Sequence, residues 1–189
     1  IIVLTVVSYI YSRSLLVSES RETMLAYSQK YAADIETIIS QKMNYVEVSA
    51  NNISKDQKRG KDLLDDLTYL TKNVAGGQDF FVGFSDKTFV DGAGWIPDAS
   101  YDPTARGWYQ GALGLKASYV SEPYITTTGN SVITISHELN YGGRSVGVFG
   151  GDVSMGDFES LIKGIVVEET GNAQLVNKNG SFIVSDKYK

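Results

Sequence analysis

The sequence predicts an α+β fold in which a long N-terminal helix precedes an antiparallel sheet of about five strands. Two patterns predict it. Over residues 18–54, apolar side chains recur at three- and four-residue steps without any glycine or proline, which is the period of a helix. Beyond residue 77 the apolar residues gather instead into short runs separated by turn residues, which is typical of strands. With 189 residues, of which 42% are hydrophobic, the chain can bury one or two cores.

The N-terminal helix is predicted to lead out of a membrane. Residues 1–17 begin with an apolar run that is shorter than the ~20 residues needed to cross a bilayer. We interpret this run as the outer end of a transmembrane helix, with Tyr9 and Tyr11 at the interface. A signal-peptide core is the alternative interpretation. So long a helix is unusual in a globular domain, and a membrane exit or a dimer seam would explain it.

The remaining elements follow in order. A polar connector at 51–60 separates the long helix from a second one at 61–73, and both belong to a predicted unit at 18–75. A sheet unit at 76–156 has strands at 80–84, 88–90, 119–124, 131–139 and 145–153, with a short helix at 105–114 before the third strand. Residues 157–189 are predicted to hold a connecting helix and a hairpin around 179–180. We expect that hairpin to open a second, membrane-proximal module that continues beyond this chain.

Residues 101–109 are the most informative part of the sequence. Arg106, Trp108 and Tyr109 follow a proline-containing turn at the start of the predicted short helix. An arginine binds a carboxylate through two parallel hydrogen bonds, while indole and phenol groups add neutral donors. Further along the chain, Asp152 ends an apolar strand and is suited to an ammonium group. A cation in one place and an acid in another is the pattern that a free amino acid requires.

Each of these residues also has an ordinary structural interpretation. Arg106 could stack on a neighbouring ring at the surface, and Trp108 could be a core residue. Tyr101 could be a turn residue, and Asp152 could cap the following helix. His137 lies in the middle of a predicted strand with no second histidine in the chain, so we interpret it as structural.

The order of several short motifs resembles the double Cache (dCache) sensor domain of bacterial transmembrane receptors. The resemblance covers most of residues 20–189 and is carried by Gly94-Trp95, Tyr101-Asp102-Pro103, Arg106-Gly107-Trp108-Tyr109, Glu122-Pro123-Tyr124 and the glycine-rich run that ends at Asp152. It implies a PAS-like antiparallel sheet as the membrane-distal module. The amino-acid-binding branch of that family has a motif matched one for one by Tyr101, Arg106, Trp108, Tyr109 and Asp152.

One position departs from the family. Many relatives carry an aspartate two residues after the tyrosine that corresponds to Tyr124, and this chain has Thr126 there. The change removes one possible partner for an ammonium group. We expect Tyr124 and Thr126, together with Asp91 and Trp95 from the loop before the motif, to line the same pocket.

Composition and motifs exclude several other functions. A net charge of −5 argues against a nucleic-acid-binding surface. The chain has no cysteine, which excludes disulfides, thiolate metal sites and cysteine nucleophiles. Neither a nucleophile elbow, a metal-ligand spacing nor a phosphate loop is present in the sequence. We therefore expect no catalytic residue, no metal and no cofactor.

The resemblance implies the sensor of a methyl-accepting chemotaxis receptor that binds a free L-amino acid. Arg106, Trp108 and Tyr109 would hold the carboxylate, while Tyr101 and Asp152 would hold the ammonium group. The receptor would lie in the inner membrane as a homodimer through the long helix, with the sensor periplasmic or extracellular. Alternatives are a sensor for a carboxylate, amine or purine, a sensor of a histidine kinase or cyclic-dinucleotide enzyme, and a structural dimerisation ectodomain.

Overall fold

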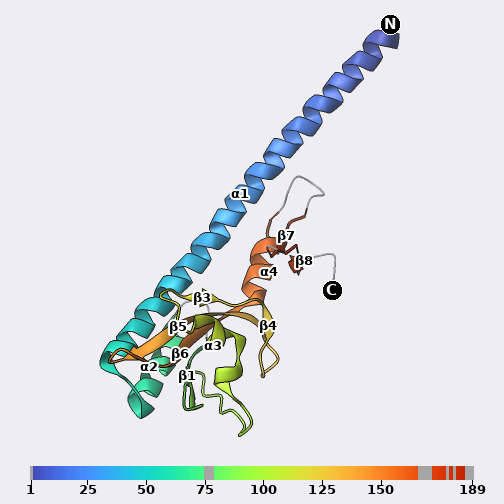
Figure 1. Ribbon diagram of the computed structural model, residues 1–189. Coiled ribbons are helices and arrows are strands. Elements are labelled where there is room, and N and C mark those ends of the chain that lie inside the picture. Colours follow the sequence, from blue (N-terminus) through green and yellow to red (C-terminus); the bar gives the residue numbers. More distant parts are fainter. Residues whose placement is uncertain (1, 75–78, 166–171, 178, 181, 186–189) are drawn as a thin grey trace.

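Helix α1 (Ile2–Asp56) is a single continuous helix, as the sequence predicts. The computed structural model describes residues 2–74, 79–165, 172–177, 179–180 and 182–185. The N-terminal half of α1 extends well beyond the rest of the molecule (Figure 1), and nearly all of its described residues are exposed. By length and composition α1 is apolar enough to cross a membrane. The assignment of residues 1–17 to the end of a membrane span stays a prediction, and residue 1 lies outside the described residues.

The predicted connector at 51–60 is wrong over its first half, because α1 runs through it to Asp56. Asparagine and serine are poor helix formers, but Ile53 is only 3% exposed and packs in the core. Tertiary packing therefore overrides the local preference. The chain reverses only at Gln57 and Gly60, which both adopt positive φ angles, and α2 (Gly60–Asn73) follows at once.

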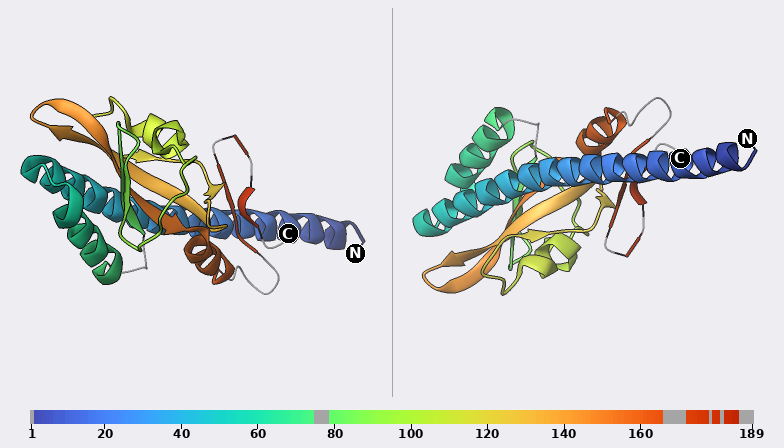
Figure 2. Two further views of the ribbon diagram at one scale, coloured as in Figure 1. Left: turned by 90° about the horizontal axis from the view of Figure 1, so that it is seen from below. Right: turned by 90° about the horizontal axis from the view of Figure 1, so that it is seen from above.

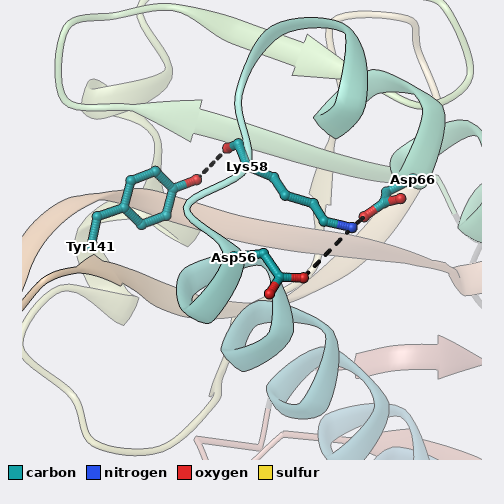
Figure 3. Close-up of polar contacts among 4 residues, drawn as sticks. All are labelled: Asp56, Lys58, Asp66 and Tyr141. Carbon is teal, nitrogen blue, oxygen red and sulfur yellow. Dashed lines mark hydrogen bonds and ion pairs between the residues drawn. The ribbon is translucent and has the colours of Figure 1, made fainter.

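Polar contacts fix this corner of the molecule (Figure 3). The Nζ atom of Lys58 lies 2.5 Å from the Asp66 carboxylate on α2 and 3.9 Å from that of Asp56 at the end of α1. The hydroxyl group of Tyr141 donates a hydrogen bond of 2.5 Å to the carbonyl oxygen of Lys58. One residue thus connects both helices with the far end of the sheet.

The sheet is antiparallel throughout. Its centre is a long hairpin of β5 (Ser131–Tyr141) and β6 (Arg144–Ser154), and β1 (Phe80–Phe84) pairs with the other edge of β6. The short strand β2 (Phe89–Asp91) pairs with β1. On the opposite side, β3 (Tyr119–Val120) and β4 (Tyr124–Ile125) both pair with β5. The sheet has six strands instead of about five because Pro123, which lacks an N–H group, interrupts the predicted strand at 119–124.

The two faces of the sheet serve different purposes. One face packs against α1 and α2 and holds the main core, which includes Phe80, Phe149 and Ile135. The other face is covered by the 3₁₀ turn η1 (Pro103–Ala105) and the short helix α3 (Gly107–Ala112). Figure 2 shows α1 and α3 on opposite sides of the sheet. A smaller apolar cluster lies under α3 and leaves room for a cavity.

The described C-terminal residues extend away from this sheet along α1 (Figure 1). Helix α4 (Met155–Lys163) starts directly after β6, and the side chain of Ser154 caps it by accepting a hydrogen bond from the Gly156 N–H group. The hairpin of β7 (Gln174–Val176) and β8 (Phe182–Ser185) forms a separate two-stranded sheet. Residues 166 and 181, which the sequence assigned to a helix and a strand, lie outside the described residues. The predicted second module stays a prediction.

Candidate functional site

A cavity of about 410 Å³ lies on the α3 face of the sheet. Its walls come from β1, β2, the loop at 91–102, the start of α3, the turn between β4 and β5, and the start of α4. Eight of the nine residues that the sequence indicates line it, and they are Asp91, Trp95, Tyr101, Arg106, Trp108, Tyr124, Thr126 and Asp152. The fold thus brings together residues as far apart in the chain as Asp91 and Asp152.

Arg106 provides the positive charge of the cavity. It occupies the cap position between η1 and α3, and the Asp102 side chain holds η1 by accepting a hydrogen bond of 2.9 Å from the Thr104 N–H group. The guanidinium carbon lies 5.8 Å from the ring centre of Tyr101 and 6.0 Å from that of Tyr124. Among the described residues, no carboxylate lies within 4 Å of Arg106. Its charge is therefore available to an anionic group.

Asp152 provides a negative charge in the same cavity. Its Oδ1 atom accepts a hydrogen bond of 2.5 Å from the Thr134 hydroxyl group on the neighbouring strand. Because that proton is used, the Tyr124 hydroxyl group donates to the Thr134 oxygen at 2.7 Å. Burial raises the pKa of Asp152 to about 6, although the Thr134 hydrogen bond opposes the rise. A carboxylate this costly to ionise calls for a cationic partner.

Two further aspartates line the cavity beside Asp152. Asp91 is 6% exposed, and its Oδ1 atom accepts hydrogen bonds from the backbone N–H groups of Ala93 at 2.8 Å and Trp95 at 3.1 Å. Asp91 therefore stabilises the loop that follows it. Asp79 precedes β1, and burial, together with the charges of Asp91 and Asp152, raises its pKa to about 7. The acids outnumber the single arginine.

Aromatic rings form the wall next to Arg106. Trp95 and Tyr101 meet edge to face with their ring centres 5.1 Å apart, and both make similar contacts with Phe89. Trp108 is 2% exposed, touches Phe81 with ring centres 5.0 Å apart, and also lines the cavity. Trp108 is therefore both a core residue and part of the cavity wall. Such a wall favours a ligand with an apolar part.

Close packing at Gly83 positions α3. A Cβ atom at Gly83 would lie 2.8 Å from the Pro103 Cβ atom and 2.9 Å from the Trp108 ring. Because Gly83 has no side chain, the turn and helix on either side of Arg106 pack directly against the sheet at β1.

Tyr109 is the one indicated residue that lies outside the described lining of the cavity. It is 3% exposed and packs with Trp108, Ala112 and Val148 in the small cluster under α3. Successive residues of a short helix face different ways, so Trp108 and Tyr109 do not share one direction. A ligand contact by Tyr109 stays a prediction.

Sequence reasoning missed Asp79. Polar residues in front of an apolar strand give no signal by themselves. Strand alternation was the signal that could have found it, because Asp79 lies two positions before Phe81 and therefore on the same face. That inference needs to know which face carries the cavity, which only the assembled sheet shows.

Comparisons with known proteins bear on this site. The sequence profile of the methyl-accepting chemotaxis protein-like first PDC sensor domain matches residues 50–160. The chain is 36% identical over 87 residues, 46% of its length, to methyl-accepting chemotaxis protein PscA of Pseudomonas syringae pv. tomato, and 28% identical over 155 residues, 81% of its length, to McpG of Pseudomonas putida. These matches cover 14% and 24% of the two relatives, so the chain spans a quarter or less of their lengths.

The fold is also similar to solved receptor domains. The ligand-binding domain of the Pseudomonas fluorescens chemoreceptor CtaA, in complex with L-serine, superposes with a TM-score of 0.71 and is 27% identical. The match covers 84% of this chain and 69% of that domain. These findings confirm the predicted α+β fold and the predicted resemblance. The chain belongs to the family of methyl-accepting chemotaxis protein-like first PDC sensor domains.

Proposed function

We propose that the cavity binds a free L-amino acid and that this binding is the signal the domain reports. One observation carries the proposal: Arg106 and Asp152 line one small cavity, and neither forms an ion pair with any residue that the structure describes. Tyr124 connects the two charged residues: its ring centre lies 6.0 Å from the Arg106 guanidinium carbon, and its hydroxyl group bonds Thr134, which donates to Asp152. An amino acid carries both complementary charges on one carbon atom.

The same assignment gives each residue a role. Arg106 would hold the carboxylate through paired hydrogen bonds with Trp108 beside it, and Tyr101 would contact the ammonium group. Asp152 would hold the ammonium group and is kept in place by Thr134 and Tyr124. Complexes of CtaA with L-serine, L-valine, L-alanine and L-leucine support this reading, because that domain is 27–28% identical to this chain.

The setting of the domain is part of the proposal. The relatives are chemotaxis receptors by name, and α1 carries an exposed apolar N-terminal stretch. We propose an inner-membrane receptor with this domain outside the cytoplasm and a homodimer through α1. The start of α4 lines the cavity, and Phe158 and Ile162 of α4 pack in the core shared with α1. Ligand binding would shift the balance between two arrangements of these helices.

A thermal-shift assay separates amino-acid sensing from carboxylate sensing. Titration with L-alanine, L-serine, L-valine and L-leucine should raise the melting temperature for at least one of them. The deaminated acids of the same chain length should not, because they place a second anion near Asp152 without a cation. Equal stabilisation by an amino acid and its deaminated analogue would favour the carboxylate-sensor alternative instead.

A further inference from the structure

We propose that Asp79 is a second acidic contact for the ligand and that it shares the ammonium group with Asp152. This inference rests on the proposed amino-acid-binding function. Asp79 would be a specificity residue outside the motif formed by Tyr101, Arg106, Trp108, Tyr109 and Asp152.

The register of the sheet places the two acids side by side. Phe80 of β1 pairs with Gly151 of β6, so the next position brings Asp79 opposite Asp152. The Asp152 N–H group donates a hydrogen bond of 2.9 Å to the Asp79 carbonyl oxygen at this point. Directly opposite residues in an antiparallel pair point to the same face with Cβ atoms about 4.5–5.5 Å apart. Both side chains line the cavity.

Asp79 has unused hydrogen-bonding capacity. Its Oδ1 atom is fully buried and accepts no hydrogen bond from any described residue. A buried acceptor without a partner is destabilising, and an ammonium group has three N–H donors to offer. Because Oδ1 is buried, the Asp79 side chain would rotate to place its carboxylate beside one ammonium group that it shares with Asp152.

Three other groups that line the cavity already have partners, and one of them, Glu159, pairs with Lys163 at 3.4 Å. Asp91 uses its Oδ1 atom to hold Ala93 and Trp95 in the loop. The Thr126 hydroxyl group accepts a hydrogen bond of 3.0 Å from the Asn130 N–H group within a turn. Thr126 therefore brings no charge to the ammonium group. Asp79 reaches the same cavity from another strand and supplies the second acid.

This arrangement of acids predicts that amino-acid binding is coupled to the release of a proton. The ionisable groups that face the cavity are Asp79, Asp91, Asp152 and Glu159 with Tyr101, Tyr124 and Arg106. Burial first, and then the charges of Asp91 and Asp152, raise the pKa of Asp79 to about 7. An ammonium group binds the ionised form, so amino-acid binding at neutral pH should displace a proton from Asp79.

Isothermal titration calorimetry tests this with the same four amino acids. For the wild-type domain, affinity should rise about twenty-fold from pH 6 to pH 8, of which about two-fold comes from Asp152. Titrations at pH 7 in phosphate and in Tris should show proton release. Asp79→Asn should lower the affinity at pH 8 at least ten-fold and reduce the pH effect to about two-fold. Asp34→Asn, an exposed acid on α1, is the matched control and should change neither quantity.

The outcomes separate the two claims. If the wild-type domain binds an amino acid but Asp79→Asn binds it equally well with the same pH dependence, the role of Asp79 is overturned while the proposed function stands. If the wild-type domain binds the amino acid at pH 7 without releasing a proton, that result alone would overturn the role of Asp79. If no amino acid binds to the wild-type domain at any pH, both the proposed function and this inference fail.

Discussion

At the scale of single residues, the cavity keeps opposite charges apart. Arg106 lies near the rings of Tyr101 and Tyr124, and no ion pair joins it to Asp152 among the described residues. Separated charges in a partly buried site are poorly solvated, and each gains when a ligand brings the opposite charge. This arrangement disfavours the empty cavity and favours a zwitterion over a simple acid or amine.

Arg106→Ala should abolish detectable amino-acid binding and leave the fold intact. Removing the partner of a buried carboxylate costs roughly 2–5 kcal/mol, which is about 30- to 4000-fold in affinity. Calorimetry measures the loss, and circular dichroism checks the fold. Arg144→Ala, on an exposed hairpin end, is the matched control and should bind normally. An unchanged affinity in Arg106→Ala would remove this residue from the site.

The pH dependence of stability should report the buried acids without ligand. The folded-state pKa values, about 7 for Asp79 and about 6 for Asp152, lie above the ordinary value of 3.8. The folded protein therefore holds these protons more tightly than the unfolded chain does. The stability that this contributes is present at low pH and is lost as pH rises from about 4 to 7, where the buried carboxyl groups ionise. After allowance for solvent screening, Asp79→Asn should melt about 2–8 °C higher than wild type at pH 8 and show no such gain at pH 4.

The comparison of variant with wild type isolates this effect. Burial lowers the pKa of His137, which makes the domain less stable as pH falls, but it acts equally in both proteins. Equal melting temperatures for Asp79→Asn and wild type at pH 8 would show that the Asp79 carboxylate is well solvated.

The sequence predicted most of the residues that line the cavity because they are concentrated in one stretch of the chain. Arg106, Trp108 and Tyr101 lie within eight positions, and their chemistry is visible without a fold. Asp79 and the inward packing of Tyr109 depend on strand register and helix direction, which no local pattern specifies. The sequence alone therefore does not reveal which residues enter or leave the cavity through long-range packing.

At the scale of elements, α2 supports the acidic side of the cavity. The Thr71 hydroxyl group accepts a hydrogen bond of 3.2 Å from the Phe80 N–H group, next to Asp79. A Cβ atom at Gly92 would lie 2.4 Å from the Leu67 carbonyl oxygen, so α2 touches the loop that follows Asp91. Long-range packing likewise holds the last turns of α1, since Ile53 is buried in the core among polar residues that favour a loop.

Gly92→Ala should therefore destabilise the domain by about 1–3 kcal/mol, because the added methyl group meets backbone that cannot turn aside. It should also weaken amino-acid binding by displacing the Asp91 loop. Gly107→Ala is the control for stability, because a Cβ atom there meets nothing within 4 Å. Denaturant unfolding measures both variants, and equal midpoints would contradict the close contact between α2 and the loop.

At the scale of the whole molecule, the sheet separates two tasks. One face packs on α1, which leads toward the proposed membrane anchor, and the other face carries the cavity. The strands β1, β5 and β6 contribute side chains to both faces, and α4 starts at the cavity before packing beside α1. The overall α+β arrangement was predictable because each element has a strong local period. The division of faces emerged only from the pairing order of the strands.

A crystal structure of the domain with the amino acid that stabilises it most would test the central claim most directly. We expect electron density for the ligand in the cavity between β1, α3 and β6. Its carboxylate should lie within hydrogen-bonding distance of the Arg106 guanidinium group, and its ammonium group should lie beside Asp152 and Asp79. A ligand bound outside this cavity, or one whose ammonium group points away from both aspartates, would contradict the account.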